Sequence, residues 1–315
     1  MKRIVLTVIA AFFAACIVNA QDLASATETY NSGAEQLSMG NKEAALSAFQ
    51  EALALGEACG EEGADLVANC KSTIPSLILS IGKELYNDKN FDDALAKIKE
   101  ASAKAAEYGN EEVVAEVADL IPVITGAKSM AAGTDAFNAK DYAKAVESFK
   151  AVLESDPENG AAALRIVQCL SNLGDFAAAK EALATAEANG QGANAKKVLG
   201  SALLKKAAAD LKAGKNADAI AAAVESAEYA ENAQAYLIAG QASTKANKDA
   251  DAIANYEKYL ELSPAAKNAG AITFTVAALY QKAGNKAKAL ENYKKVLADP
   301  TYGAQAKAQV DALSK

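Results

Sequence analysis

A spaced triplet of small and apolar residues recurs seven times along the chain. In each triplet a small residue is followed by a mostly bulky residue four positions later and by a third residue three positions after that. This spacing keeps all three on one face of an α-helix, so the pattern predicts a series of amphipathic helices. The triplets are Ala45/Phe49/Ala52, Ala94/Ile98/Ala101, Ala145/Phe149/Val152, Ala179/Leu183/Ala186, Ala219/Ala223/Ser226, Ala252/Tyr256/Tyr259 and Ala289/Tyr293/Val296.

A second column of mostly small residues stands twelve positions before each triplet. Its members are Gly33, Gly82, Gly133, Val167, Ala207, Gly240 and Ala277. Turn-forming pairs such as Gly40-Asn41 and Gly284-Asn285 separate the two columns. Because small side chains at both points let two helices approach closely, we expect stacked helical hairpins and an all-α fold.

The distance between successive triplets changes along the chain. It is 49 and 51 residues for the first two intervals and 34, 40, 33 and 37 residues for the last four. The extra residues, Gly56 to Ile74 and Ala105 to Ile121, keep an apolar helical period and therefore predict lengthened helices. Pro75 and Pro122 follow these stretches and are expected to bend or break their helices.

These patterns divide the chain into four expected regions. Residues 1–20 form a signal peptide, residues 21–156 form repeats with lengthened helices, and residues 157–300 form regular repeats. Residues 301–315 form a helix that caps the exposed end of the last repeat.

The repeated unit resembles the tetratricopeptide repeat (TPR) family over roughly residues 23–300. The small-residue column, the triplets, the turn glycines and helix-ending prolines such as Pro157 and Pro264 carry the resemblance. It implies a right-handed α-solenoid of about seven helical hairpins that binds other proteins on its concave surface. Two departures are the absence of tryptophan and the presence of Ala223 at a bulky position, where we expect weaker packing.

The N-terminal residues predict an exported protein. A basic start at Lys2 and Arg3, an apolar run and a small residue at Ala20 are typical of a secretory signal peptide cleaved after Ala20. This interpretation places the protein in the periplasm or outside the cell. The alternative is a lipoprotein signal in which Cys16 is acylated and anchors the chain at the outer membrane, where it would assist envelope assembly.

Composition argues against several classes of function. Removal of Lys2 and Arg3 leaves 30 basic and 40 acidic residues, and such an acidic chain lacks the basic footprint of a nucleic-acid-binding protein. The chain has no histidine, and it shows no phosphate-binding or calcium-binding loop, so we expect no cofactor, no metal and no enzymatic activity. A carbohydrate-binding protein is less favoured, because the aromatic content is 6% and tryptophan is absent.

Two cysteines lie close together in the sequence. Cys59 and Cys70 stand 11 positions apart on either side of a turn-like segment, and in an exported protein this spacing predicts a disulfide. The alternative is a pair of buried free thiols. Cys169 lies within an apolar helical stretch and is interpreted as a small core residue.

The resemblance also points to a partner-binding surface, because the first helix of each TPR hairpin lines the concave side. An apolar column would comprise Tyr30, Leu79, Met130, Leu164, Leu204, Leu237 and Phe274. A polar ladder would comprise Ser38, Asn87, Asn138, Asn172, Lys212, Lys245 and Lys282. Asparagine side chains can hydrogen-bond an extended peptide and lysines attract acidic segments, so the expected partner is a peptide segment of another exported or envelope protein. A purely structural use of both sets is the alternative, since lysine and asparagine also suit helix C-termini.

Overall fold

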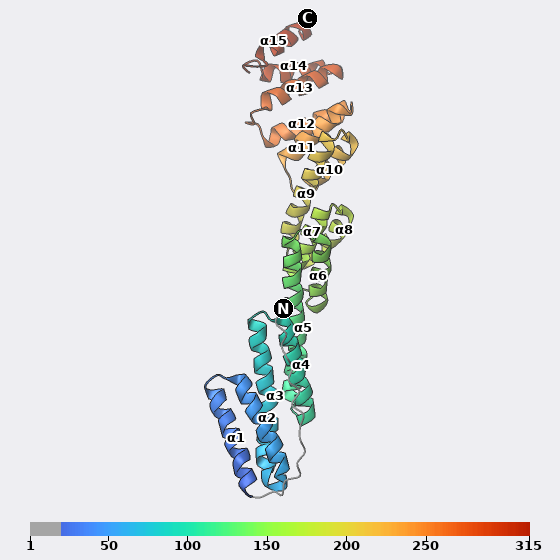
Figure 1. Ribbon diagram of the computed structural model, residues 1–315. Coiled ribbons are helices and arrows are strands. Elements are labelled where there is room, and N and C mark those ends of the chain that lie inside the picture. Colours follow the sequence, from blue (N-terminus) through green and yellow to red (C-terminus); the bar gives the residue numbers. More distant parts are fainter. Residues whose placement is uncertain (1–19) are drawn as a thin grey trace. The chain divides into compact units, whose positions relative to one another are not determined.

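The computed structural model describes residues 20–315, which contain fifteen α-helices, one 3-10 turn and no strand (Figure 1). The all-α solenoid of helical hairpins predicted from the triplets is confirmed. Apart from Ala20, the predicted signal peptide lies outside the described residues, as does Cys16. Among residues 20–315, no helix combines the length and the apolar character that a membrane crossing needs.

Contacts between helices divide the chain into two compact units, Met1–Lys128 and Ser129–Lys315. The described part of the first unit contains α1 (Ala20–Ser38), α2 (Lys42–Ala58), the 3-10 turn η1 (Gly60–Gly63), α3 (Ala64–Asn87), α4 (Phe91–Tyr108) and the first part of α5 (Glu111–Asn138). In this unit α1 packs against α2 and α3 packs against α4, so consecutive helices form hairpins.

The core of the first unit is built from the first two triplets. All six of their side chains are buried, and they join Cys70, Ile74 and Ile78 of α3 in one apolar cluster. The small-residue column works as predicted here: a Cβ atom added to Gly82 would stand 2.6 Å from the side chain of Ile98. Only a glycine lets α3 and α4 approach this closely, because packed interiors leave no space for one more methyl group.

The inserted residues form long helices with one interruption. Helix α3 has 24 residues and α5 has 28 residues, whereas η1 separates α2 from α3. Of the bend or break predicted at the two prolines, the break does not occur: α3 continues through Pro75 and α5 continues through Pro122. Each proline removes one backbone hydrogen bond, but buried neighbours such as Ile74 and Ile124 hold the helix on either side.

The disulfide predicted between Cys59 and Cys70 is not formed in the structure, where both are buried free thiols. Cys59 lies at the C-terminal end of α2, and its thiol donates a hydrogen bond to the carbonyl oxygen of Leu55 at 3.2 Å. Cys70 lies inside the apolar cluster of the unit, and burial raises the pKa of its thiol. The two cysteines therefore lie in different local environments, one at a helix end and one in the apolar core.

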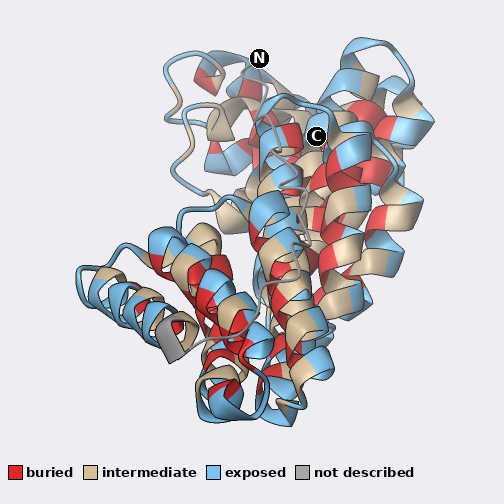
Figure 2. Cartoon of the chain, turned by 60° about the horizontal axis from the view of Figure 1, so that its bottom comes forward, coloured by how far each residue is buried: buried red, intermediate tan, exposed pale blue. Residues whose placement is uncertain are grey.

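The second unit continues with α5 and ten further helices. These are α6 (Tyr142–Ser155), α7 (Gly160–Leu173), α8 (Phe176–Ala188), α9 (Gly192–Lys212), α10 (Asn216–Tyr229), α11 (Ala233–Lys245), α12 (Asp249–Leu262), α13 (Ala269–Lys282), α14 (Lys286–Lys295) and α15 (Gly303–Leu313). Figure 2 shows buried and exposed residues side by side on the same helices, which is typical of amphipathic helices. All fifteen residues of the last five triplets are buried.

The fifth triplet compensates for its small side chains with a hydrogen bond. The buried Ser226 hydroxyl donates to the carbonyl oxygen of Gly200 at 2.7 Å and ties α10 to α9. At the other end of the unit, Ala306, Val310 and Leu313 of α15 pack against the cluster formed by α12, α13 and α14. Helix α15 therefore covers the apolar end of the last hairpin.

Candidate functional site

The predicted apolar column contributes mainly to the core. Leu237 is buried, and Leu164 and Leu204 are half-buried against the clusters of their own hairpins. The Phe274 ring packs against the rings of Tyr293 and Tyr302, with centroids 5.2 and 5.4 Å away. These four side chains therefore present little apolar surface to a partner.

The predicted polar ladder is exposed throughout. Its asparagines and lysines occupy the last residue, or the last but one, of a hairpin's first helix: Asn87, Asn138, Asn172, Lys212, Lys245 and Lys282. Asn172 donates a hydrogen bond to the Gln168 carbonyl oxygen at 2.8 Å, and Lys282 pairs with Asp249 at 2.6 Å. The other four make no side-chain hydrogen bond or ion pair within the described residues, and lysines here favourably meet the negative end of the helix dipole.

A groove of about 720 Å³ lies between the end of α7 and one face of α9. We call it the α7–α9 groove. It is lined by Ser171, Asn172, Leu173, Gly174, Phe176, Lys197, Val198, Ser201, Ala202, Lys205, Lys206 and Ala209. Asn172 is the one member of the predicted column and ladder that borders it.

The groove lies at the C-terminal end of α7, beside the longer helix α9. The turns that precede the two helices lie together, since the Asn189 amide donates a hydrogen bond to the Pro157 carbonyl oxygen at 2.8 Å. Helix α7 then runs for 14 residues and α9 for 21. Seven extra residues extend α9 by about 10 Å, so α7 leaves the far part of α9 uncovered. The 40-residue spacing between the fourth and fifth triplets is the sequence signal of this extension.

The two halves of α9 are fixed by different neighbours. Leu199 and Leu203 are buried in the cluster that α6, α7 and α8 share, whereas Leu204 and Leu211 pack against the cluster formed with α10 and α11. The remaining face of α9 carries Lys197, Ser201 and Lys205 toward solvent. This face is therefore held rigidly without being covered.

The groove combines an apolar surface with positive charge. Leu173 is 49% exposed, and Phe176 and Val198 are half-buried beside it. Lys206 is ion-paired with Asp210, whereas Lys197 and Lys205 make no hydrogen bond or ion pair through their side chains within residues 20–315. None of the described residues that line the groove is acidic. Such a surface can bind an anionic segment that also carries apolar side chains.

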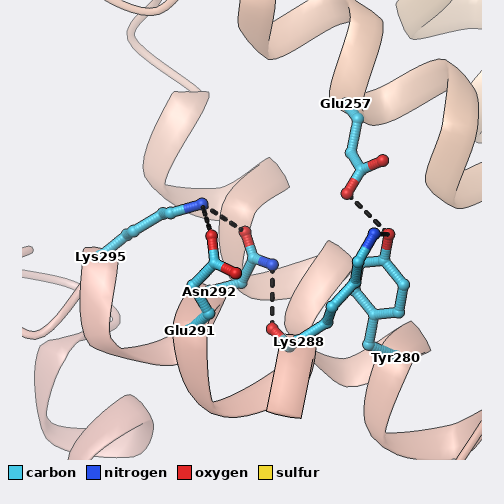
Figure 3. Close-up of polar contacts among 6 residues, drawn as sticks. All are labelled: Glu257, Tyr280, Lys288, Glu291, Asn292 and Lys295. Atoms are coloured by element: carbon cyan, nitrogen blue, oxygen red, sulfur yellow. Dashed lines mark hydrogen bonds and ion pairs between the residues drawn. The ribbon is translucent and has the colours of Figure 1, made fainter. Parts of the chain in front are cut away.

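A polar cluster on the last hairpins is the second constellation of interest (Figure 3). The Tyr280 hydroxyl of α13 donates a hydrogen bond to Glu257 of α12 at 2.7 Å and accepts one from Lys288 of α14 at 3.1 Å. Burial raises the pKa of Tyr280, and its hydrogen bond raises the pKa of Lys288. The cluster ties three consecutive helices together, so we interpret it as a structural brace.

Metal and thiol chemistry find no support in the described part of the chain. Within residues 20–315 no group of three or more cysteine or acidic side chains is placed to hold a metal ion. The Cys169 thiol is buried, and burial raises its pKa to about 11, which keeps it protonated at neutral pH.

The stacked hairpins, the two columns of packing residues and the open groove define an α-helical repeat protein. Residues 136–202 and 204–267 each match a tetratricopeptide repeat family model. Residues 136–267 therefore contain tetratricopeptide repeats, as the sequence pattern predicts. Repeats of this kind bind partners on extended surfaces, so the chain is assigned to the protein-interaction scaffolds.

Solved structures that match parts of the chain have low sequence identity to it. A MamA protein is 23% identical, with 57% of this chain and 94% of that chain covered and a TM-score of 0.34. YrrB, described as a TPR protein with an unusual peptide-binding site, is 16% identical, with coverages of 57% and 91% and a TM-score of 0.31. A TPR protein from Parabacteroides merdae ATCC 43184 is 12% identical, with coverages of 93% and 100% and a TM-score of 0.27. No curated protein matches the sequence.

Proposed function

We propose that this protein is a non-enzymatic scaffold of the cell envelope that holds a peptide segment of another exported protein. The observation that carries the proposal is the α7–α9 groove, because it is open, partly apolar and built on rigid helices of the matched repeats. Exposed apolar surface bordered by polar groups is typical of sites that bind proteins.

Export is the second part of the proposal and rests on the N-terminal residues. A basic start followed by an apolar run supports cleavage after Ala20, which makes Gln21 the first residue of the mature chain. The competing form begins at an acylated Cys16 and is anchored at the outer membrane. Intact mass of the protein purified from its native cells distinguishes the two forms, and an uncleaved Met1 would contradict both.

A site-specific cross-linking experiment tests the binding function. A photoreactive amino acid is placed at Ser201 in the groove and, as a control, at Val224 of α10, which is 40% exposed and lies outside it. After illumination in intact cells, we expect one discrete cross-linked protein from Ser201 and none from Val224. The same products at both positions, or none at Ser201, would refute the groove as the binding site.

The predicted ladder provides an extension of this test. Lys212 and Lys245 are the exposed last residues of α9 and α11. Their side chains have no partner within residues 20–315, so both can form ion pairs with a longer bound segment. Replacement of both by glutamate should weaken the Ser201 cross-link if the segment extends along these helix ends. An unchanged cross-link would confine the bound segment to the α7–α9 groove.

A further inference from the structure

We infer that the occupant of the α7–α9 groove is an acidic, extended segment of the partner protein, with apolar side chains between its carboxylates. This inference rests on the proposed binding function and adds the chemistry of the partner. The carboxylates face Lys197 and Lys205, and the apolar side chains contact Leu173, Phe176 and Val198.

The charge of the groove is opposite to that of the chain. The chain has 40 acidic and 32 basic residues, yet three lysines and no carboxylate line the groove. Asp210 neutralises Lys206, whereas Lys197 and Lys205 have no counter-charge on the described residues. Two lysines without a partner, held beside exposed apolar surface, form a local site that favours negative charge.

The positions of the two lysines set the spacing of the carboxylates. Lys197, Ser201 and Lys205 follow one another at four-residue intervals and therefore lie in one line along α9. The eight residues from Lys197 to Lys205 span about 12 Å of helix. An extended chain advances about 3.3 Å per residue, so carboxylates about four positions apart reach both lysines.

Asn172 supplies the polar contact that suits an extended segment. Its amide nitrogen is used inside α7, where it donates to the Gln168 carbonyl oxygen. Its side-chain oxygen is left as an acceptor at the edge of the groove and can receive a backbone N–H of the segment. An extended peptide has such free N–H groups, whereas a bound helix has already used nearly all of them internally.

Other anions fit these observations less well. A nucleic acid or an anionic membrane presents a long array of charges, and the acidic remainder of the chain repels both. Two unpaired lysines are also few for such a polyanion. A short acidic segment needs no more than the groove itself.

Binding of defined peptides tests the inference. The probe is a fluorescein-labelled, C-terminally amidated peptide with two glutamates four positions apart and leucines between them. The matched peptide has glutamine in place of both glutamates. Fluorescence anisotropy is measured for the full chain, for K197Q/K205Q and for the control K144Q/K307Q, which changes the net charge equally at exposed lysines outside the groove. Circular dichroism verifies that each variant is folded.

We expect the acidic peptide to bind the wild-type chain about tenfold more tightly than the glutamine peptide, since two exposed ion pairs contribute on this order. K197Q/K205Q should lose that tenfold preference and bind both peptides alike, whereas K144Q/K307Q should keep it. The preference should also decrease as salt is raised, because these charges are exposed.

Four results would overturn the inference: no binding of the acidic peptide, equal binding of both peptides to wild type, a preference that survives in K197Q/K205Q, and tighter binding of an oligonucleotide or of phosphatidylglycerol vesicles. If one of these occurs while Ser201 still cross-links to a protein, the acidic partner is wrong and the scaffold function stands. The absence of any Ser201 cross-link in cells refutes the groove as the binding site, and with it the observation that carries the proposed function.

Discussion

The contact between Gly133 and Phe149 permits a stringent test of how the repeats pack. Phe149 is fully buried on α6, and a Cβ atom added to Gly133 of α5 would stand 2.7 Å from its ring. The ring occupies the space that the glycine leaves. The two positions should therefore be strongly coupled, and each substitution should change the effect of the other.

Each single substitution has a definite expected cost. Phe149→Ala removes a buried ring and should destabilise the protein by about 3 to 5 kcal/mol. Gly133→Ala gains about 1 kcal/mol of helix propensity. It also forces the ring to move, and such overpacking costs about 1 to 3 kcal/mol, so the net effect should be destabilising.

The double variant should reverse the sign of the glycine substitution. Once Phe149 is alanine, the added methyl group at position 133 meets an empty space and keeps its propensity gain, so Gly133→Ala should stabilise by about 1 kcal/mol. Urea unfolding followed by far-ultraviolet circular dichroism gives the four free energies of unfolding. Because repeat arrays unfold in parts, hydrogen exchange of α5 and α6 should accompany it.

The control is Ala132→Gly, at an exposed neighbour on the same helix. It should cost about 1 kcal/mol in both backgrounds, because propensity alone is involved. If Gly133→Ala stabilises equally with and without Phe149, the close packing of the two positions is refuted.

Three further predictions follow from burial in the structure. In the folded protein the Cys169 thiol should resist alkylation, because burial raises its pKa to about 11. After unfolding without reductant, Cys59, Cys70 and Cys169 should all be alkylated, and protection of Cys59 and Cys70 would show that they form a disulfide. Burial raises the pKa of Tyr293 above its ordinary value of 10.0, so its contribution to stability is complete below pH 10 and is lost as the pH rises through the folded pKa. Comparison of urea unfolding at neutral pH and above pH 10, for wild type and Tyr293→Phe, tests this, and the loss should be smaller in the variant. Deletion of α15 from Gly303 onward should expose the last apolar cluster and lower the hydrogen-exchange protection of α13 and α14. Unchanged protection would show that the helix is not a cap.

Sequence periodicity predicts the core because packing in this fold is local. Phe49, Ile98, Phe149 and Tyr256 are buried against a glycine sixteen positions earlier, and both partners belong to one hairpin. A pattern confined to one hairpin is readable without knowledge of the rest of the fold. Of the predicted bend or break at Pro75, the break does not occur, because the packing of surrounding residues, which no local pattern contains, outweighs the loss of one hydrogen bond.

The candidate site was less accessible to prediction. Lys197, Ser201 and Lys205 stand in the middle of a helix and outside both predicted columns, so family resemblance does not single them out. Two signals were present in the sequence: the 40-residue spacing and the recurrence of polar residues every four positions along α9. The face of α9 that stays uncovered depends on how α7 and α9 pack together, and the sequence of α9 alone does not contain this information.

The site and the irregular repeat have the same physical origin. In repeats of equal length each first helix is flanked along its whole length by the first helices of the neighbouring repeats. A first helix of 21 residues beside one of 14 leaves about 10 Å of helix that packs on one side only. Leu211 in this stretch packs against the cluster formed with α10 and α11, so the stretch does not need a partner to stay folded. Lys197 and Lys205 lie on the preceding turns of the same rigid helix, so binding orders mainly the partner segment and not the lysines' own helix.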